Sequence, residues 1–237
     1  MGDEGGEYPP YIISFFTEVV GTAIMMYIGC MGCIRYPDLG PIVPSFSFGL
    51  SILAVIQTFH HIGPVHLNPA VSIGFLIVSK IAWQYFLVYL AGQFIGAFVG
   101  YGALFLLTPE MENMCLLKNK LGLNVVQCFL NEVLCSMVLM LLILGAVDEK
   151  NKDFKDSIAL RIAMGVTGII FALEPFTGAG LNPARSVPPA VFFLNFENLW
   201  QYMLGPAAGM AIGAVLYRFF FDGGEAHSLH TFLRSKE

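Results

Sequence analysis

The triplet Asn-Pro-Ala occurs twice in this chain, and each copy follows a glutamate that is embedded in apolar sequence. Glu18 precedes Asn68 by 50 residues, and Glu132 precedes Asn182 by 50 residues. A charged residue inside a long apolar tract is costly in a membrane, so a tract that keeps one needs a partner for it. Two copies with one spacing predict that the chain is built from an internal repeat.

Each triplet opens a short apolar segment, at 68–79 and at 182–194. Neither segment is long enough to cross a bilayer. Proline is favoured in the first turn of a helix, where its missing N–H leaves no bond unmade. Each segment is therefore predicted to be a half-helix that enters the membrane and stops, with these residues at its tip: Asn68, Pro69 and Ala70, or Asn182, Pro183 and Ala184. Two further prolines, Pro188 and Pro189, lie within the second segment, and we expect a kink or a widening there.

Long apolar segments account for most of the remaining sequence. The chain of 237 residues is 56% hydrophobic and 12% charged, about half the charge of an average soluble domain. Six segments have the length of a membrane-spanning helix, roughly at 12–33, 43–60, 82–107, 125–147, 158–174 and 198–221. The sequence predicts an all-α integral membrane protein with six transmembrane helices and two re-entrant half-helices, forming a single transmembrane domain over 1–237.

The last span of each half carries small residues at the same spacing, namely Gly92, Gly96 and Gly100 in one and Gly205, Gly209 and Gly213 in the other. A repeat that contains three spans must insert in opposite orientations, which is the plan of an inverted repeat. We place the first repeat at about 10–107 and the second at about 124–221.

Orientation follows from lysine and arginine in the short loops. Six spans leave both termini on one side, which collects Lys80, Lys150, Lys152, Lys155, Arg218, Arg234 and Lys236. The other side has Arg35, Lys118 and Lys120. Both termini are therefore expected in the cytoplasm, with 1–9 and 222–237 flexible. The acidic opening MGDEGGEYPP lacks the pattern of a cleaved signal peptide, so we expect the first span to be an uncleaved anchor.

Non-helical backbone at membrane depth is tolerated where it is buried in protein or lines a water-filled cavity. The segments before the two half-helices are expected to line such a cavity with a series of carbonyl acceptors, the carbonyl ladder: Gly63, Pro64, Val65, His66, Gly178, Ala179, Gly180 and Leu181. The two half-helices enter from opposite faces, so their N-termini, each carrying about half a positive charge, meet near the middle. That field repels cations and hydronium.

Asn68 and Asn182 are expected to cap the half-helices and to offer amide N–H groups to passing water. Water held by both amides accepts from them and cannot pass a proton between them. Glu18 and Glu132 are expected to accept backbone N–H groups from the non-helical segment of their own half. The alternative for an intramembrane carboxylate is a proton relay or a neutral core residue; its repetition favours the supporting role.

These motifs resemble those of the aquaporin, or major intrinsic protein, family. The resemblance rests on HLNPAV, GLNPARS, the upstream glutamates, SFGLS and GQFIGA, and it covers essentially 10–221. It implies six helices and two half-helices around one pore in each subunit, usually in a homotetramer. It also implies a constriction formed by four residues, the candidate filter: Phe48, Ile170, Ala179 and Arg185.

The candidate filter departs from the family pattern at Ile170. Water-selective members resemble each other in carrying a histidine twelve residues before the second Asn, and no histidine lies within 158–181. An apolar wall opposite Arg185 suits a solute with a carbon face and a hydroxyl face. In this respect the chain is similar to a glycerol-permeable branch of insect aquaporins. Short loops and Ser186 after Arg185 are nevertheless typical of water channels.

The sequence thus predicts a passive plasma-membrane channel for water and small uncharged solutes such as glycerol or urea, which excludes protons and ions. A strictly water-selective channel is the alternative, and a secondary transporter or a closed-pore structural protein is a more distant one.

The chain has no pattern for an enzyme, a cofactor, a metal or a nucleic-acid partner. Its five cysteines do not form the pattern of a disulfide framework, and Cys30 and Cys33 lack the second pair of ligands that a metal site needs. The histidines His60, His61 and His66 admit a pH sensor, although a backbone-facing role is commoner.

Overall fold

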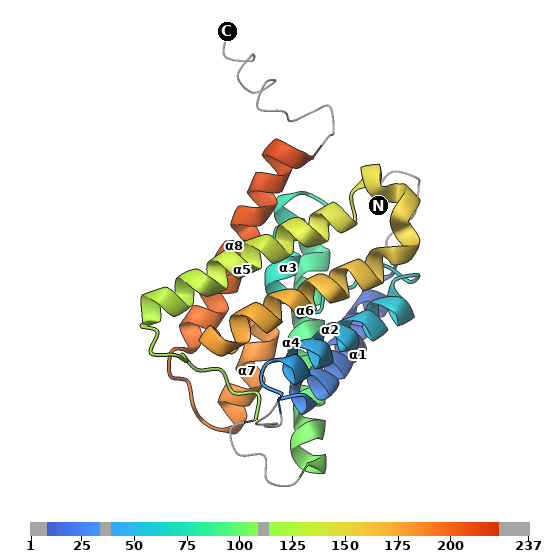
Figure 1. Ribbon diagram of the computed structural model, residues 1–237. Helices are drawn as coiled ribbons and strands as arrows, with labels where there is room; N and C mark the ends of the chain where they lie inside the picture. Colours follow the sequence, from blue (N-terminus) through green and yellow to red (C-terminus); the bar gives the residue numbers. More distant parts are fainter. Residues whose placement is uncertain (1–8, 34–38, 109–113, 223–237) are drawn as a thin grey trace.

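A computed structural model of the chain describes residues 9–33, 39–108 and 114–222. The described part is helical, and its helices cross one another at steep angles around a central region (Figure 1). The expected flexibility of the two termini falls almost entirely outside the described residues. So do Arg35, Arg234 and Lys236, which were counted in the prediction of orientation.

In the described part of the chain, six helices are long and apolar enough to cross a membrane. They are α1 (Tyr11–Met31), α2 (Ile42–Phe59), α4 (Trp83–Leu107), α5 (Val125–Ala146), α6 (Ile158–Thr177) and α8 (Leu199–Leu216). A 3-10 segment (Glu149–Ser157) leads into α6, and a π-helical turn (Tyr217–Phe221) extends α8. The two short helices are α3 (Pro69–Ile77) and α7 (Pro183–Phe192). The predicted fold class is confirmed, and the boundaries agree with the apolar segments to within a few residues.

The two halves pack by the same contacts, because glycines allow two backbones to approach closely. A Cβ added to Gly96 of α4 would lie 2.3 Å from the carbonyl oxygen of Val19 in α1. A Cβ added to Gly209 of α8 would lie 2.2 Å from the carbonyl oxygen of Val133 in α5. Val133 follows Val19 by 114 residues, the same shift that relates Glu132 to Glu18. The repeat is therefore structural as well as sequential.

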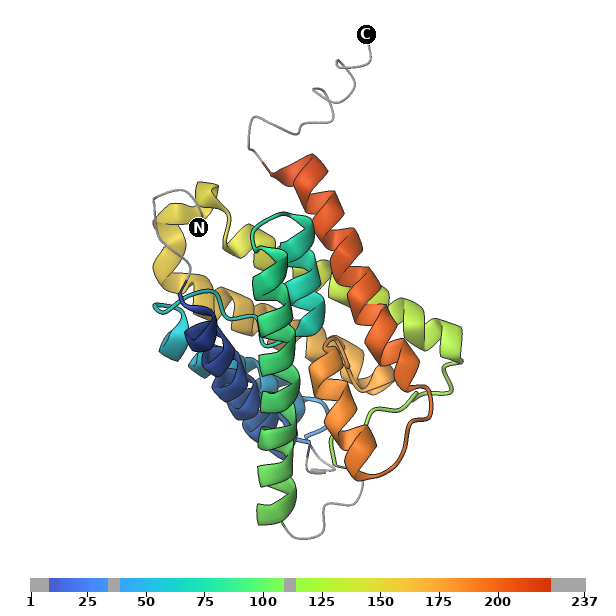
Figure 2. The ribbon, with the colours of Figure 1, turned by 180° about the vertical axis from the view of Figure 1, so that it is seen from behind.

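The two halves meet where α2 crosses α6. A Cβ on Gly49 would lie 2.9 Å from the carbonyl oxygen of Ala163, and Ala163 is the residue that the 114-residue shift makes equivalent to Gly49. A contact between equivalent residues is what a pseudo-two-fold axis produces. α3 and α7 lie between α4 and α8 and approach each other by their N-terminal ends (Figure 2).

Each half-helix begins because an asparagine caps it. The Oδ1 atom of Asn68 accepts from the N–H of Ala70 at 2.9 Å, and Oδ1 of Asn182 accepts from the N–H of Ala184 at the same distance. Proline follows each cap at the first helical position, as expected. The helix α7 contains Pro188 and Pro189 and runs on to Phe192.

Candidate functional site

In the first half, a buried carboxylate holds the non-helical segment before α3. Glu18, fully buried in α1, accepts the N–H of His66 at 2.6 Å and that of Leu67 at 2.8 Å. The Nε2 group of Gln93 in α4 donates to the same carboxylate at 3.0 Å and to Ser72 at 3.0 Å. Backbone donors that no helix satisfies at membrane depth thereby gain an acceptor.

In the second half, Glu132 has the same task with one different partner. It accepts the N–H of Gly180 at 2.8 Å and that of Leu181 at 2.7 Å. Its third donor is the hydroxyl of Thr177 at 2.6 Å, at the end of α6. In both halves a glutamate thus accepts from two consecutive backbone N–H groups and from one side chain. The side chain is Gln93 in the first half and Thr177 in the second.

The residue before each asparagine has a left-handed backbone conformation. Leu67 has φ 58° and Leu181 has φ 55°. This conformation costs a non-glycine residue about 1–2 kcal/mol. The two glutamates bond the N–H groups of these same leucines, so the supporting contact and the strained residue coincide. No sequence signal marks leucine for this conformation.

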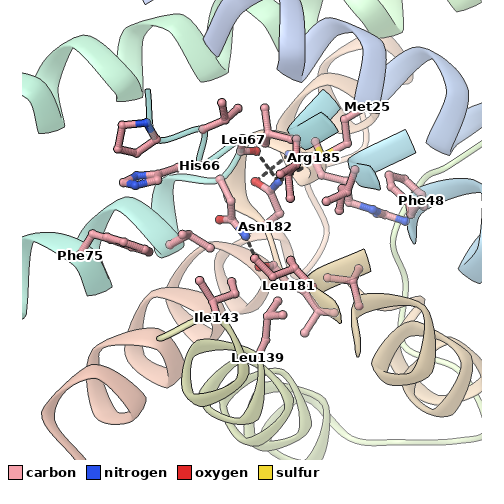
Figure 3. A pocket seen from close by; sticks show the side chains of 18 of the residues that line it. Met25, Phe48, His66, Leu67, Phe75, Leu139, Ile143, Leu181, Asn182 and Arg185 are labelled. Atoms are coloured by element: carbon pink, nitrogen blue, oxygen red, sulfur yellow. Dashed lines mark hydrogen bonds between the residues drawn. The ribbon is translucent and has the colours of Figure 1, made fainter. Parts of the chain in front are cut away.

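The two asparagines also bind across the middle of the molecule. Nδ2 of Asn68 donates to the carbonyl oxygen of Leu181 at 2.9 Å, and Nδ2 of Asn182 donates to that of Leu67 at 2.8 Å. Figure 3 shows the bond between Asn182 and Leu67. A carboxamide has two N–H donors, so each asparagine has a second one after the bond to the opposite half, and Nδ2 of Asn182 also lies 3.9 Å from the sulfur of Met25, a weak acceptor. These reciprocal bonds fix the tips of α3 and α7 to each other.

A cavity of about 140 Å³ runs past both asparagines, a volume that accommodates several waters. Its wall is mostly aliphatic and aromatic, with Asn68, Asn182 and Arg185 as polar groups along it. Arg185 and Phe48 lie together toward one end, and His66 and Phe75 lie away from them (Figure 3). His60 and Lys80 also line the cavity.

All four residues of the candidate filter line this cavity. The guanidinium carbon of Arg185 lies 5.3 Å from the centre of the Phe48 ring, a cation–π distance. Its Nη1 donates to the carbonyl oxygen of Cys115 and its Nη2 to that of Gly178, each at 3.3 Å. Arg185 is nearly buried, at 5% exposed, yet a guanidinium has five donors, so others remain for a solute.

The structure places the proposed carbonyl ladder only in part along the cavity. Six of its eight residues line it, and Leu67, which the sequence did not single out, lines it as well. Gly63 and Gly178 lie in the described part of the chain but are not among the lining residues. The carbonyl of Gly178 is engaged by Arg185, and that of Pro64 accepts from the hydroxyl of Tyr89 at 3.1 Å.

Two tyrosines belong to the site and were missed. Tyr89 donates to the carbonyl oxygen of Pro64, and Tyr202 donates to that of Thr177 at 2.9 Å. Both are fully buried or nearly so. Tyr89 tethers the first non-helical segment to α4, and Tyr202 tethers the end of α6, directly before the second segment, to α8. Each precedes the first matched glycine of its span by three residues. Extending the comparison of the halves by one helical turn would have found them.

The expectation for the cysteines is wrong for one pair. Cys30, in the last turn of α1, forms a disulfide with Cys115, which lies between α4 and α5. The two are 85 residues apart, and only the tertiary fold brings them together. A single bond of this kind leaves no spacing pattern in a sequence, because many loop arrangements are compatible with one pair.

Comparison with known proteins agrees with this geometry. The family model described as "Major intrinsic protein" matches residues 9–217. The lens fiber major intrinsic protein of Rattus norvegicus is 34% identical over 212 residues, which cover 87% of this chain and 80% of that protein. The protein of the same name from Lithobates pipiens is 34% identical over 210 residues, covering 86% and 79%.

Among solved structures, the X-ray structure of the aquaglyceroporin from Plasmodium falciparum superimposes with a TM-score of 0.74. It is 23% identical, and the match covers 87% of this chain and 95% of that one. This likeness concerns the fold. The family model covers nearly all of the described helices, and the structure has the paired half-helices with asparagines at their tips. The chain therefore belongs to the major intrinsic protein, or aquaporin, family and is an integral membrane channel, not an enzyme.

Proposed function

We propose that the chain is a passive pore for water and for small uncharged solutes such as glycerol or urea, and that it excludes protons and ions. The observation that carries the solute range is the position of Ile170 in the same cavity wall as Arg185. An isoleucine there offers neither a hydrogen bond nor a charge. Phe48, Ile170 and Ala179 would then contact the carbon face of a polyol, while Arg185 would donate to its hydroxyl groups.

Proton exclusion is proposed to arise where the half-helices meet. The positive ends of α3 and α7 face each other there, and Asn68 and Asn182 cap them. The second amide N–H of each asparagine would hold the oxygen of a passing water, in Asn182 in place of its contact with the Met25 sulfur, so that the hydrogens of the water point away from the other amide. The positive charge of Arg185 adds a second barrier to cations. In this proposal Glu18 and Glu132 support the pore and do not relay protons.

We place the protein in the plasma membrane with both termini in the cytoplasm, as a homotetramer with one pore in each subunit. The Cys30–Cys115 disulfide supports this orientation. Disulfides persist in oxidising compartments and are rare in the cytosol. Cys30 lies in the last turn of α1, whereas the N-terminus is at the other end of that helix. The side that carries the disulfide is then the extracellular one.

A strictly water-selective pore is the second candidate, and one observation favours it. Phe48 and Ile170 are both bulky, and the guanidinium of Arg185 lies close to the Phe48 ring. A passage bounded by these side chains admits water more readily than a three-carbon polyol.

Vesicle swelling distinguishes the two. Proteoliposomes that contain the native chain, Ile170→His or Ile170→Leu are exposed to sucrose, glycerol and urea gradients. Histidine adds a polar contact opposite Arg185, so we expect Ile170→His to lower the ratio of glycerol flux to water flux by about tenfold, the discrimination that a small change in a pocket provides. Ile170→Leu conserves volume and polarity and should leave the ratio unchanged.

Native vesicles that admit water but not glycerol or urea would show that the pore is water-selective. Saturable flux that depends on an ion gradient would indicate a carrier instead. Vesicles without osmotic water flow would contradict the channel proposed here and favour a closed-pore structural protein.

A further inference from the structure

Three of the five cysteines meet beside Arg185. Cys30 and Cys115 form the disulfide, and Cys33, two residues beyond the end of α1, is a partly exposed free thiol. The Sγ atom of Cys33 lies 3.5 Å from Sγ of Cys115. A free thiol is thus in van der Waals contact with one sulfur of a disulfide, which is the arrangement from which thiol–disulfide exchange starts.

The backbone of Cys115 contacts the candidate filter. Its carbonyl oxygen accepts from Nη1 of Arg185, and the neighbouring carbonyl of Met114 accepts from the hydroxyl of Tyr101 at 2.7 Å. Cys115 has φ 63°, a left-handed conformation that a non-glycine residue adopts at a cost of about 1–2 kcal/mol. The side-chain bond of Cys115 and the hydrogen bonds of this segment together hold that conformation. The disulfide and an acceptor for Arg185 therefore belong to the same residue.

We propose that Cys30, Cys33 and Cys115 form a thiol–disulfide exchange site that sets the position of Arg185 in the pore. The thiolate of Cys33 attacks Sγ of Cys115, a Cys33–Cys115 bond forms and the Cys30–Cys115 bond breaks. The electron pair leaves on Sγ of Cys30, which takes up the proton that Cys33 released. One disulfide and one thiol are present before and after the step, so no oxidant or reductant is consumed.

The geometry gives the exchange a consequence for the filter. The sulfurs of Cys33 and Cys115 must move from 3.5 Å to about 2.05 Å to form a bond. The hydrogen bond from Arg185 to the Cys115 carbonyl is 3.3 Å long, beyond the usual range of about 2.7–3.2 Å. The two sulfurs thus approach by about 1.5 Å in total, and a shift of a few tenths of an ångström at the Cys115 carbonyl is enough to make or break a bond of this length. The two disulfide forms would therefore hold Arg185 differently.

The charges around Cys33 determine when the exchange is fast. Burial raises the pKa of the Cys33 thiol, the Arg185 guanidinium lowers it in part, the Glu174 carboxylate raises it and Lys120 lowers it. Among the described residues, Tyr101 is a further titratable group near it. Because the thiolate is the nucleophile and the net pKa shift is upward, exchange should be slow at pH 7 and faster at pH 9.

A matched pair of variants isolates the two forms. Cys33→Ser leaves only the Cys30–Cys115 bond available in this cluster, and Cys30→Ser leaves only Cys33–Cys115. Native and variant channels in vesicles are incubated at pH 7 and pH 9, alkylated, digested without reductant and mapped by mass spectrometry. We expect both bonds in the native chain, with the Cys33–Cys115 fraction reached sooner at pH 9, and a Cys33–Cys115 bond in Cys30→Ser.

Osmotic water flux and the glycerol-to-water ratio are measured on the same vesicles. We expect at least one of them to differ between Cys30→Ser and Cys33→Ser by about fivefold, the factor that corresponds to one ordinary hydrogen bond. Cys115→Ser, which removes both bonds, is the control for the loss of any anchor. Cys135→Ser is the control for replacement of a cysteine outside the cluster.

Two results would overturn the proposal. Native chain that contains only Cys30–Cys115 after incubation at pH 9, with Cys115 a free thiol in Cys30→Ser, would exclude the exchange. Equal water and glycerol fluxes in two variants that carry different bonds would exclude its effect on the pore. The native disulfide map requires no variant to fold. The effect on flux rests on the proposed function, whereas the disulfide map does not. If glycerol enters none of the vesicles, the proposed solute range is wrong. The exchange is then decided by the disulfide map and the water flux.

Discussion

The two ends of the cavity are related by the repeat, yet they differ in chemistry. The 114-residue shift assigns a counterpart to each residue of the candidate filter. The counterparts of Phe48, Ile170, Ala179 and Arg185 are Ile162, Ile56, Val65 and Val71, in that order. All eight line the same cavity. One end thus carries an aromatic ring and a guanidinium, whereas the other, the apolar counterpart, is aliphatic throughout.

This difference separates what supports the pore from what selects its contents. The glutamates, the capping asparagines and the close glycine contacts occur in both halves, because both non-helical segments need the same backbone support. Arg185 occurs in one half only, and Val71 takes the equivalent place in the other. Selectivity is therefore expected to depend on substitutions at one end, while stability depends on equivalent residues in both.

The largest effect should come from the buried glutamates. Glu18→Ala and Glu132→Ala each remove the acceptor of two buried backbone N–H groups and of one side-chain donor, which we expect to cost about 4 kcal/mol each. The midpoint of thermal unfolding in detergent should fall by about 10 °C for either variant. Glu197→Ala, at an exposed site, is the control and should be neutral. A large loss in one half and none in the other would break the equivalence of the two supports.

The glycine crossings should give the next largest effect. Gly96→Ala and Gly209→Ala place a Cβ within 2.3 Å and 2.2 Å of a backbone carbonyl oxygen, so the helices must separate. We expect each to destabilise the fold by about 2 kcal/mol, as overpacking does. Gly168→Ala, where nothing lies within 4 Å of the new Cβ, should be neutral or slightly stabilising in the same thermal measurement. Tolerance of one crossing alone would show that the halves pack differently.

Replacing Arg185 by valine makes the candidate filter resemble its apolar counterpart. A permeating cation about 10 Å from the Arg185 guanidinium is repelled by about 1.7 kcal/mol at an effective dielectric constant of about 20. This energy corresponds to more than a factor of ten in the rate of cation passage. We therefore expect Arg185→Val to raise cation or proton leak by about tenfold, measured with a pH-sensitive dye inside vesicles. Val71→Ala alters the equivalent position without any charge and should leave the leak unchanged. An unchanged leak in Arg185→Val would remove this residue from the charge barrier.

The smallest effect should distinguish the two isoleucines. Ile170→His is expected to lower the glycerol-to-water ratio because a second polar group then faces Arg185. Ile56→His places the same side chain at the apolar counterpart, where Val71 replaces the arginine, and should change the ratio by less than about twofold. Stopped-flow swelling in glycerol and sucrose measures both. An equal effect would show that narrowing alone, at either end, controls passage.

The sequence predicted the elements well because their signals are local or periodic. Apolar runs of membrane length gave six spans within a few residues of the observed helices. The proline after each asparagine marked the start of α3 and α7, since only a first-turn proline fits a helix without loss. The repeat then identified Glu18 and Glu132 as partners of their own segments, although neither the distance nor the third donor was predictable.

Other parts of the site depend on contacts between distant residues. The reciprocal bonds of Asn68 and Asn182 exist because two half-helices from different halves meet tip to tip. The left-handed leucines are stabilised by glutamates 49 residues away. The departure of Gly63 and Gly178 from the cavity wall follows from how each segment turns, which residue type alone does not specify.

The sequence by itself determined the number of spans, the inverted repeat, the family and the residues at the tips of the half-helices, because hydrophobic length, proline position and repeated spacing are recorded along the chain. Only the tertiary structure decided that Cys30 bonds to Cys115, that the Cys115 carbonyl reaches Arg185, and that an aliphatic counterpart lines the same cavity as the candidate filter. These are relations between side chains from different helices, and they are fixed by how the two halves pack across their pseudo-two-fold axis.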